Sequence, residues 1–164
     1  MRNMTFMNQI RLFLAMLTLV GLAACGPASE GPGAKPAPTA ETTQSACQPS
    51  KIQPTANGFS EVRATMKSSG EIWALLFFDT ARTLTDEKIV WRISGSGQLD
   101  FRAENGNGIV IHPVWGPDFH ESSNWNRPGE EWGTGFNFPE RGCWTITVTH
   151  GATVGEIRLS VLAP

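Results

Sequence analysis

The chain has 164 residues, with 13 Lys and Arg against 15 Asp and Glu and a formal net charge of −2. The basic residues form no cluster, which argues against a nucleic-acid partner, because such partners are held mainly by patches of Lys and Arg. The chain is long enough for one domain to bury its own core without a structural metal or a partner subunit.

The first 25 residues follow the pattern of a bacterial lipoprotein signal. A basic start precedes an apolar run at residues 12–20, which is too short to span a bilayer. The letters LAAC at residues 22–25 match the lipobox, in which Cys25 is acylated after residues 1–24 are removed. The alternative is an ordinary signal peptide cut elsewhere, in which case Cys25 carries no lipid. The pattern favours lipidation of Cys25 and an extracytoplasmic location.

Membrane attachment is expected to depend on the lipid alone. Removal of residues 1–24 leaves 11 Lys and Arg (13 − 2) against 15 Asp and Glu, a net charge of −4 (11 − 15). This remainder has no polybasic segment that would add a second membrane signal. We therefore expect anchoring through Cys25 to the cell membrane or, in a host with two membranes, to the outer membrane.

The segment after Cys25 is predicted to be a disordered tether. Residues 26–46 have no large apolar side chain and are rich in Pro, Gly, Ala and Thr, so they cannot form a core. Fully extended, they reach about 60 Å at roughly 3 Å per residue. Residues 25–46 are thus the lipidated start and the tether, and residues 47–164 are the predicted folded domain.

Apolar side chains in residues 47–164 recur with a period of two, in short segments bounded by Gly, Pro, Ser, Asn or Asp. This pattern predicts an all-β fold, an immunoglobulin-like sandwich of about seven strands. The nearly continuous apolar run EIWALLFF indicates a central strand covered on both faces or partly roofed by a loop. In KIVWRIS, Val90 is the exception to the alternation. The predicted strands span residues 59–64, 71–78, 88–94, 108–112, 133–138, 143–150 and 156–162, with a turn at residues 151–155 before the last.

The segment WGTGFNFPERGCWTITV and the strand that closes the chain resemble the C-terminal hairpin of a set of bacterial lipoproteins. Those proteins have an immunoglobulin-like domain and no assigned activity; in their hairpin a Leu-Pro or Phe-Pro pair leads into Gly-x-Trp and a strand rich in Val and Ile. The resemblance extends to EIWALLFF and KIVWRISGSG and so covers much of residues 60–162. It implies the same fold and an envelope location, and it brings no catalytic residues.

Two cysteines remain once Cys25 is assigned to the lipid. In an oxidising compartment this even number favours a disulfide between Cys47 and Cys143, and the alternative is two free thiols. The apolar residues after Cys143 alternate with threonines, so Cys143 shares the threonine face and points outward if the apolar face is inward. The bond would then join the start of the domain to the outside of the penultimate strand.

A long connection at residues 113–133 holds three of the six tryptophans, Trp115, Trp125 and Trp132. A loop of about 20 residues in a small domain indicates either a function or an unrecognised element. Residues 127–130 fit a type II turn, which would bring Trp125 back beside Trp132. These tryptophans and Arg127 are candidate ligand-binding residues, as a stacking platform for a sugar, a peptide or an aromatic ligand. The size of the domain favours the alternative, in which the tryptophans plug the open end of the sandwich.

His112, Asp118 and His120 are the candidate metal ligands, because imidazole and carboxylate groups suit zinc or copper. Their spacing, H-x5-D-x-H, matches no established ligand pattern, and a histidine in a loop is more often only hydrogen-bonded. No cofactor is predicted, and these three residues are the ones to test for a metal.

The leading hypothesis for function is a non-enzymatic module that binds an envelope protein or a polysaccharide through a sheet edge or through residues 113–133. The alternative is a binder of a small ligand, such as a carbohydrate or a peptide, or of a metal, through the same Trp- and His-rich segment. An enzyme such as a hydrolase is disfavoured. His150 would lie about 23 Å along the strand from Cys143 and on its opposite face, too far for a local nucleophile and base.

Overall fold

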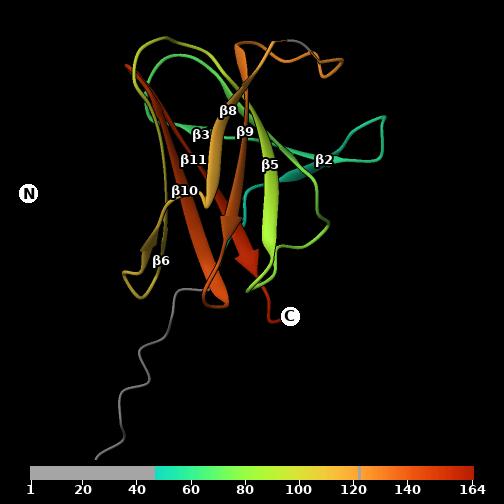
Figure 1. Ribbon diagram of the computed structural model, residues 1–164, viewed down its shortest axis with the longest axis vertical. Coiled ribbons are helices and arrows are strands. Elements are labelled where there is room, and N and C mark those ends of the chain that lie inside the picture. The colour runs from blue at the N-terminus through green and yellow to red at the C-terminus, as the bar shows by residue number, and fades with distance from the viewer. Residues whose placement is uncertain (1–46, 122) are drawn as a thin grey trace, which may run out of the picture. The chain divides into compact units, whose positions relative to one another are not determined.

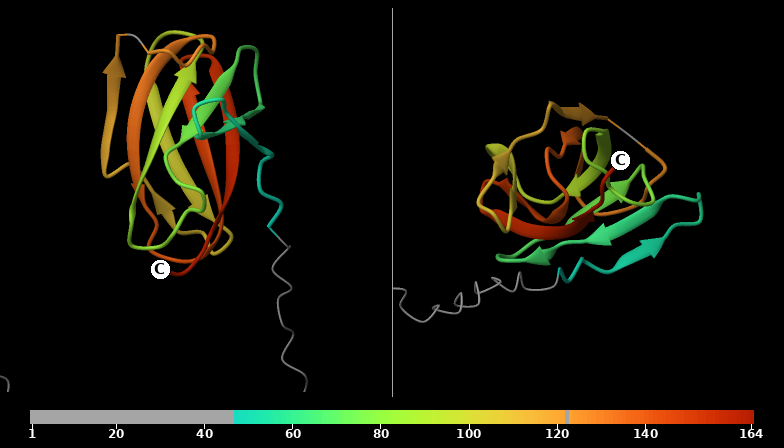
Figure 2. Two further views of the ribbon diagram at one scale, coloured as in Figure 1. Left: turned by 90° about the vertical axis from the view of Figure 1, so that its right-hand side faces the viewer. Right: turned by 90° about the horizontal axis from the view of Figure 1, so that it is seen from below.

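Two antiparallel β-sheets face each other in the part of the chain that the structure, a computed structural model, describes (Figures 1 and 2). This part comprises residues 47–121 and 123–164. The predicted signal, the lipidation site Cys25 and the predicted tether lie outside the described residues. Within the described ranges, no helix is long and apolar enough to cross a bilayer. The predicted β-sandwich is confirmed, while its immunoglobulin-like subtype stays a prediction.

The larger sheet has six strands. Across the sheet they are β1 (Ile52–Pro54), β2 (Ser60–Arg63), β4 (Ile72–Leu76), β5 (Asp86–Ile93), β9 (Glu130–Asn137) and β8 (Trp115–His120). The β1–β2 hairpin, drawn in teal, projects at the side of the sandwich (Figure 1). β4 and β5 therefore lie in the middle of the sheet, with β1 and β8 at its edges.

The smaller sheet has five strands. In order they are β3 (Thr65–Met66), β11 (Thr153–Val161), β10 (Gly142–His150), β6 (Leu99–Asn105) and β7 (Val110–Ile111). β10 and β11 form the predicted hairpin, but β11 begins at Thr153, which pairs with His150. The turn is therefore Gly151-Ala152, shorter than predicted, and Gly151 has φ +58°.

The prediction of about seven strands is incomplete, because the described residues contain eleven. The seven predicted strands are present, and the structure adds β1, β3, β6 and β8 to them. β6 has the sequence LDFRAEN, in which apolar residues alternate with charged ones. The whole of β6 pairs with β10. Residues 113–133 are not one loop, since this segment contains all of β8 and the start of β9, which agrees with the alternative of an unrecognised element.

β8 escaped prediction because its sequence contains Gly116 and Pro117, which normally interrupt strands. The register shifts between Trp115 and Asp118, and the Gly116-Pro117 peptide bond is cis. β8 tolerates proline because it is an edge strand, with a partner, β9, on one side only.

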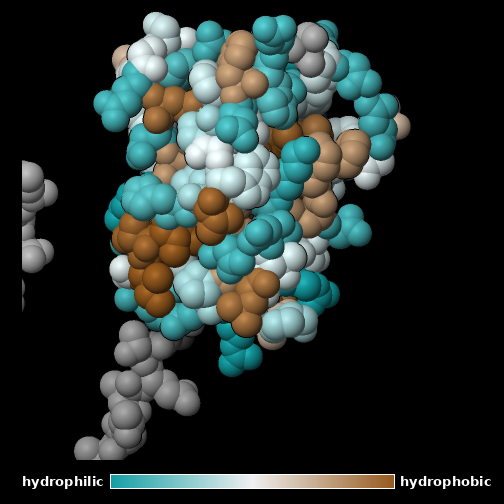
Figure 3. Space-filling model, viewed as in Figure 1, coloured by the Kyte–Doolittle hydropathy of each residue, from teal (hydrophilic) through white to brown (hydrophobic). Residues whose placement is uncertain are grey.

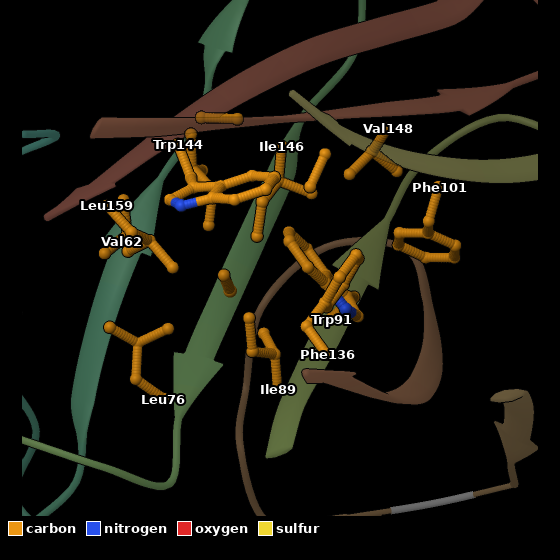
Figure 4. Close-up of a cluster of buried hydrophobic side chains, with 14 of the residues drawn as sticks. Val62, Leu76, Ile89, Trp91, Phe101, Phe136, Trp144, Ile146, Val148 and Leu159 are labelled. Carbon is orange, nitrogen blue, oxygen red and sulfur yellow. The ribbon is translucent and has the colours of Figure 1, made fainter. Parts of the chain in front are cut away.

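The core lies between the two sheets, where side chains from both converge (Figure 4). Trp91 of β5 and Trp144 of β10 are its largest members, and both are fully buried. Their indole groups stay hydrogen-bonded, because Trp91 Nε1 donates to Thr134 Oγ1 at 2.8 Å and Trp144 Nε1 donates to the Glu140 carbonyl at 2.9 Å. The alternation predicted from the sequence thus supplies one continuous apolar layer.

The disulfide predicted between Cys47 and Cys143 is present, with a Cα–Cα distance of 5.2 Å. Cys143 lies on the outer face of β10, as its place among the threonines predicts. The segment that follows Cys47 runs beside β11, because Ser50 N donates to the Arg158 carbonyl and Arg158 N donates to Ser50 Oγ, each at 2.9 Å. The bond therefore fastens the start of the described chain to the outside of the smaller sheet.

We expect the double substitution Cys47→Ser with Cys143→Ser to destabilise the fold by about 4 kcal/mol, because the bond closes a loop across a sequence separation of 96 residues. Urea denaturation of the variant and of the oxidised and reduced wild type measures this difference. The reduced wild type should match the double variant, and equal stability of all three would contradict the expectation.

Candidate ligand-binding site

The outer face of the six-stranded sheet carries apolar side chains in its middle. Side chains alternate along a strand, so Val62, Ala74 and Trp91 point into the core while their neighbours point outward. Two of these outward neighbours, Leu75 and Val90, lie opposite each other on β4 and β5 and are only 8% and 5% exposed. Something other than the second sheet must therefore cover them.

The cover consists of residues 123–129, which we call the cover segment, and of the β1–β2 hairpin with Phe59. This agrees with the prediction that EIWALLFF is a central strand partly roofed by a loop. Gly129, at the end of the cover segment, has φ +97° and packs against the backbone of Ile93, which leaves no room for a side chain. The predicted turn at residues 127–130 requires this positive φ at its third position.

The middle of the cover segment is held by the buried carboxylate of Glu61 on β2. Trp125 Nε1 donates to Glu61 Oε2 at 2.9 Å, and Arg127 Nε donates to the same oxygen at 3.1 Å. Arg127 Nη2 donates to Glu61 Oε1, which makes the arginine contact bidentate. The Arg127 guanidinium also lies 4.1 Å from the ring centroid of Trp73, a cation–π contact.

The charges of this pair stabilise each other. Burial by itself would raise the pKa of Glu61, but the hydrogen bonds from Arg127 and Trp125 and the charge of Arg127 outweigh it. The pKa of Glu61 therefore lies below its ordinary value of 4.5. The hydrogen bond to Glu61 raises the pKa of Arg127. Glu61 is thus ionised in the folded protein at neutral pH.

A second buried carboxylate, Glu131 on β9, holds the start of the cover segment directly and its end through Arg92. Ser123 Oγ donates to Glu131 Oε2, and Arg92 Nε forms an ion pair with the same oxygen at 3.0 Å. Arg92 Nη1 also donates to the Gly129 carbonyl at 3.0 Å. His120 Nδ1 lies 3.2 Å from Glu131 Oε1. Both carboxylates therefore connect the sheet to the cover segment.

A cavity of about 330 Å³ remains between the sheet and its cover, and we call it the outer cavity. Its floor is Leu75 and Val90, and Phe59, Phe77 and Trp125 stand around it. The rings of Phe59 and Phe77 contact each other, with 4.6 Å between their centroids. Figure 3 shows apolar side chains gathered on this side of the molecule, between β2 and β5. The remaining lining residues are polar or charged: Thr55, Asn57, Lys88, His120, Ser123, Asn124 and Glu131.

Trp125 lines the outer cavity and also a second hollow of about 320 Å³. This second hollow is more polar, with Asn126, Glu61 and Arg127 in its lining. Thr55, Asn57 and Asn124 border both. Trp125 thus borders two hollows, while its Nε1 donates to Glu61.

A larger hollow, of about 600 Å³, lies over the other sheet beside the disulfide. It is lined by threonines and charged residues of β6, β10 and β11, among which Arg102 pairs with Glu104 at 2.6 Å. This hollow has no aromatic wall and little apolar surface for a ligand to cover. The outer cavity is therefore the better candidate despite its smaller volume.

The three tryptophans predicted to form a platform lie in three different places. The expected contact between Trp125 and Trp132 is wrong, because Trp132 points inward from β9, with its ring 5.1 Å from that of Phe119. Trp132 is thus a plug at the core, as the alternative predicts. Trp115 lies on the outer face of β9, in the space that a side chain at Gly135 would occupy. Only Trp125 and Arg127 belong to the cover segment.

The three candidate metal ligands are also separate. His112 follows β7, and its Nδ1 lies 2.9 Å from the Phe101 carbonyl in the smaller sheet. His120 lies on the larger sheet against Glu131, and Asp118 is exposed. In residues 47–121 and 123–164, no group of three His, Cys, Asp or Glu side chains is placed to hold a metal ion. The structure therefore does not bring His112, Asp118 and His120 together.

Several residues of the outer cavity were not candidates from the sequence, namely Phe59, Leu75, Phe77, Lys88 and Val90. Two sequence features could have pointed to these residues: the unbroken apolar run around Leu75, and Val90, which departs from the alternation of apolar and polar residues. An apolar side chain on the wrong face of a strand requires a cover or a ligand. Comparisons of the chain with protein families, with curated proteins and with solved structures found no significant match.

We expect Arg127→Met to destabilise the protein by about 2 kcal/mol at about pH 7, because it leaves the buried carboxylate of Glu61 without its arginine. This cost is smaller than for a fully buried pair, because Arg127 is partly exposed to solvent. The lowered pKa of Glu61 means that its contribution to stability is present above the unfolded value of 4.5 and is lost as the pH falls through the folded value. The difference between variant and wild type should therefore narrow in acid. Urea unfolding across this pH range measures it, and a difference independent of pH would contradict the assignment.

Proposed function

We propose that this protein is a membrane-anchored extracytoplasmic lipoprotein whose β-sandwich is a non-enzymatic binding module. The observation that carries the proposal is the outer cavity, an apolar floor on the outer face of a sheet that is kept partly open under a cover held by two buried carboxylates. Its ligand is a small molecule or one group of an envelope component that fits between Phe59, Phe77 and Trp125.

The arrangement of the cover supports a binding role. The core cluster between the sheets does not include Leu75 or Val90, so the outer cavity lies outside that cluster. The cover buries most of Leu75 and Val90, and it still leaves a space beside them with aromatic walls. A concave, mainly apolar site with a few polar groups at its margin is typical of ligand-binding sites.

The same geometry favours binding over catalysis. The two carboxylates beside the cavity are engaged by Arg127 and Arg92, which leaves neither poised as a general acid or base. Cys143 is in the disulfide and so has no thiol to act as a nucleophile. A binding module that uses the outer cavity is therefore the function that these residues support best.

The anchoring part of the proposal is supported by the N-terminal sequence. The lipobox pattern that ends at Cys25, the Pro- and Gly-rich segment after it and the resemblance to bacterial lipoproteins agree with one another. The Cys47–Cys143 bond is consistent with an oxidising compartment outside the cytoplasm.

Val90→Phe should abolish ligand binding, because it fills the outer cavity from its floor and leaves the inner face of β5 unchanged. The probe is a panel of small ring compounds, neutral, anionic and cationic, added to the full chain in lipid nanodiscs. Thermal unfolding followed by tryptophan fluorescence detects binding, because a ligand that binds only the folded state raises the unfolding midpoint.

The matched control is Val154→Phe, which places the same substitution on the outer face of β11. We expect at least one compound to stabilise the wild type and Val154→Phe and to leave Val90→Phe unchanged. A panel without effect on the wild type, or a shift that persists in Val90→Phe, would refute the outer cavity as the site. A loss confined to Val154→Phe would do so as well.

Lipid attachment is tested by Cys25→Ala. Cells that express the wild type with labelled palmitate should yield a labelled protein in the membrane fraction, and Cys25→Ala should carry no label. The control is the double substitution Cys47→Ser with Cys143→Ser, which should retain the label. Unlabelled wild type, or label that persists in Cys25→Ala, would show that the N-terminus is not a lipoprotein signal.

A further inference from the structure

We propose that the outer cavity binds an organic anion, an apolar ring or short chain that carries one carboxylate, with the carboxylate at Lys88. This inference rests on the proposed function and adds the chemical class of the ligand. It follows from the positive charge of Lys88, which no carboxylate in the lining balances, and from the apolar lining and volume of the cavity.

Lys88 is the charged group that the surrounding residues leave available. It points outward from β5, and its Nζ lies 4.4 Å from the ring centroid of Phe77. Within the described ranges it forms no ion pair, whereas Arg92 and Arg127 nearby are both paired with buried carboxylates. A cation that lies beside an apolar surface and forms no ion pair is suited to receive a carboxylate.

The other charged group in the lining does not compensate Lys88. Glu131 is the single carboxylate among the described lining residues, and its oxygens already contact Arg92, Ser123 and His120. The negative charge of Glu131 is thus balanced by Arg92, which leaves the positive charge of Lys88 in excess. An anion is therefore favoured in the cavity, and a cation is disfavoured.

The remaining lining selects an apolar body for this anion. Leu75 and Val90 provide an aliphatic floor, and Phe59, Phe77 and Trp125 provide aromatic walls. A volume of about 330 Å³ is at the lower end of the range for ligand sites, which suits one ring or a short chain. The amides of Asn57 and Asn124 lie at the margin, where they can hydrogen-bond the polar end of a ligand.

The test compares three ligands that share one apolar body and differ in charge: phenylbutyrate, its neutral amide and the cationic phenylbutylamine. Isothermal titration calorimetry is carried out on the full chain in lipid nanodiscs, with empty nanodiscs as the blank. We expect the acid to bind about tenfold more tightly than the amide, and the amine more weakly than the amide. Added salt should reduce the preference, because the Lys88 side chain is exposed to solvent.

Lys88→Gln should reduce the acid-to-amide ratio to about one, while Lys88→Arg should retain it. The ratio isolates the charge, because a loss of packing against Phe77 would weaken the acid and the amide alike. Lys67→Gln removes the same charge from the smaller sheet, where Lys67 pairs with Glu156, and should leave the ratio unchanged.

Equal affinities of acid and amide in the wild type would overturn the inference, as would a preference that survives in Lys88→Gln. Absence of binding by both acid and amide would overturn it too. In each of these cases the panel tested on Val90→Phe decides independently whether the outer cavity binds any ligand. Failure of the inference is thus distinguishable from failure of the proposed function.

Discussion

Strands β4 and β5 carry apolar side chains on both faces, and the arrangement of the larger sheet depends on this constraint. The inner side chains fill the space between the sheets, so Leu75 and Val90 on the outer face need a cover of their own. The cover segment provides it together with the β1–β2 hairpin. The space that remains beneath this cover is the outer cavity, so the proposed binding site follows from the same constraint as the packing.

The cover is held by electrostatic contacts and not by an extension of the core. Removing Glu61 and Glu131 from water is costly, and each is compensated by an arginine and by further hydrogen bonds. Such buried pairs add little net stability, but they fix geometry, because a carboxylate accepts hydrogen bonds only from donors in defined positions. The bond to Glu61 thereby holds Trp125 where it lines both hollows.

The disulfide and the cover act on opposite sheets. Cys47–Cys143 fastens the start of the described chain to the outside of the smaller sheet, whereas the outer cavity opens on the larger one. If the segment before Cys47 is the proposed tether, its attachment point does not obstruct the cavity. The proposed ligand would enter the outer cavity from the solvent on that face and would reach both the apolar floor and Lys88 there.

The alternation of apolar residues, the glycine turns and the even number of cysteines are local features, and they sufficed for the β-sandwich, most of its long strands and the Cys47–Cys143 bond. The same features failed for β6 because its charged residues obscure the apolar alternation, and for β8 because Gly116 and Pro117 normally interrupt strands. The outer cavity could not be predicted for another reason. Glu61 and Arg127 are separated by 66 residues, and only the folded sheet brings that carboxylate, the indole of Trp125 and the ammonium group of Lys88 to one face. The sequence by itself determined which side chains must be buried, because burial follows from the local pattern of apolar and polar residues. The tertiary structure decided which of them surround a cavity, because contacts between distant segments leave no periodic pattern in the sequence.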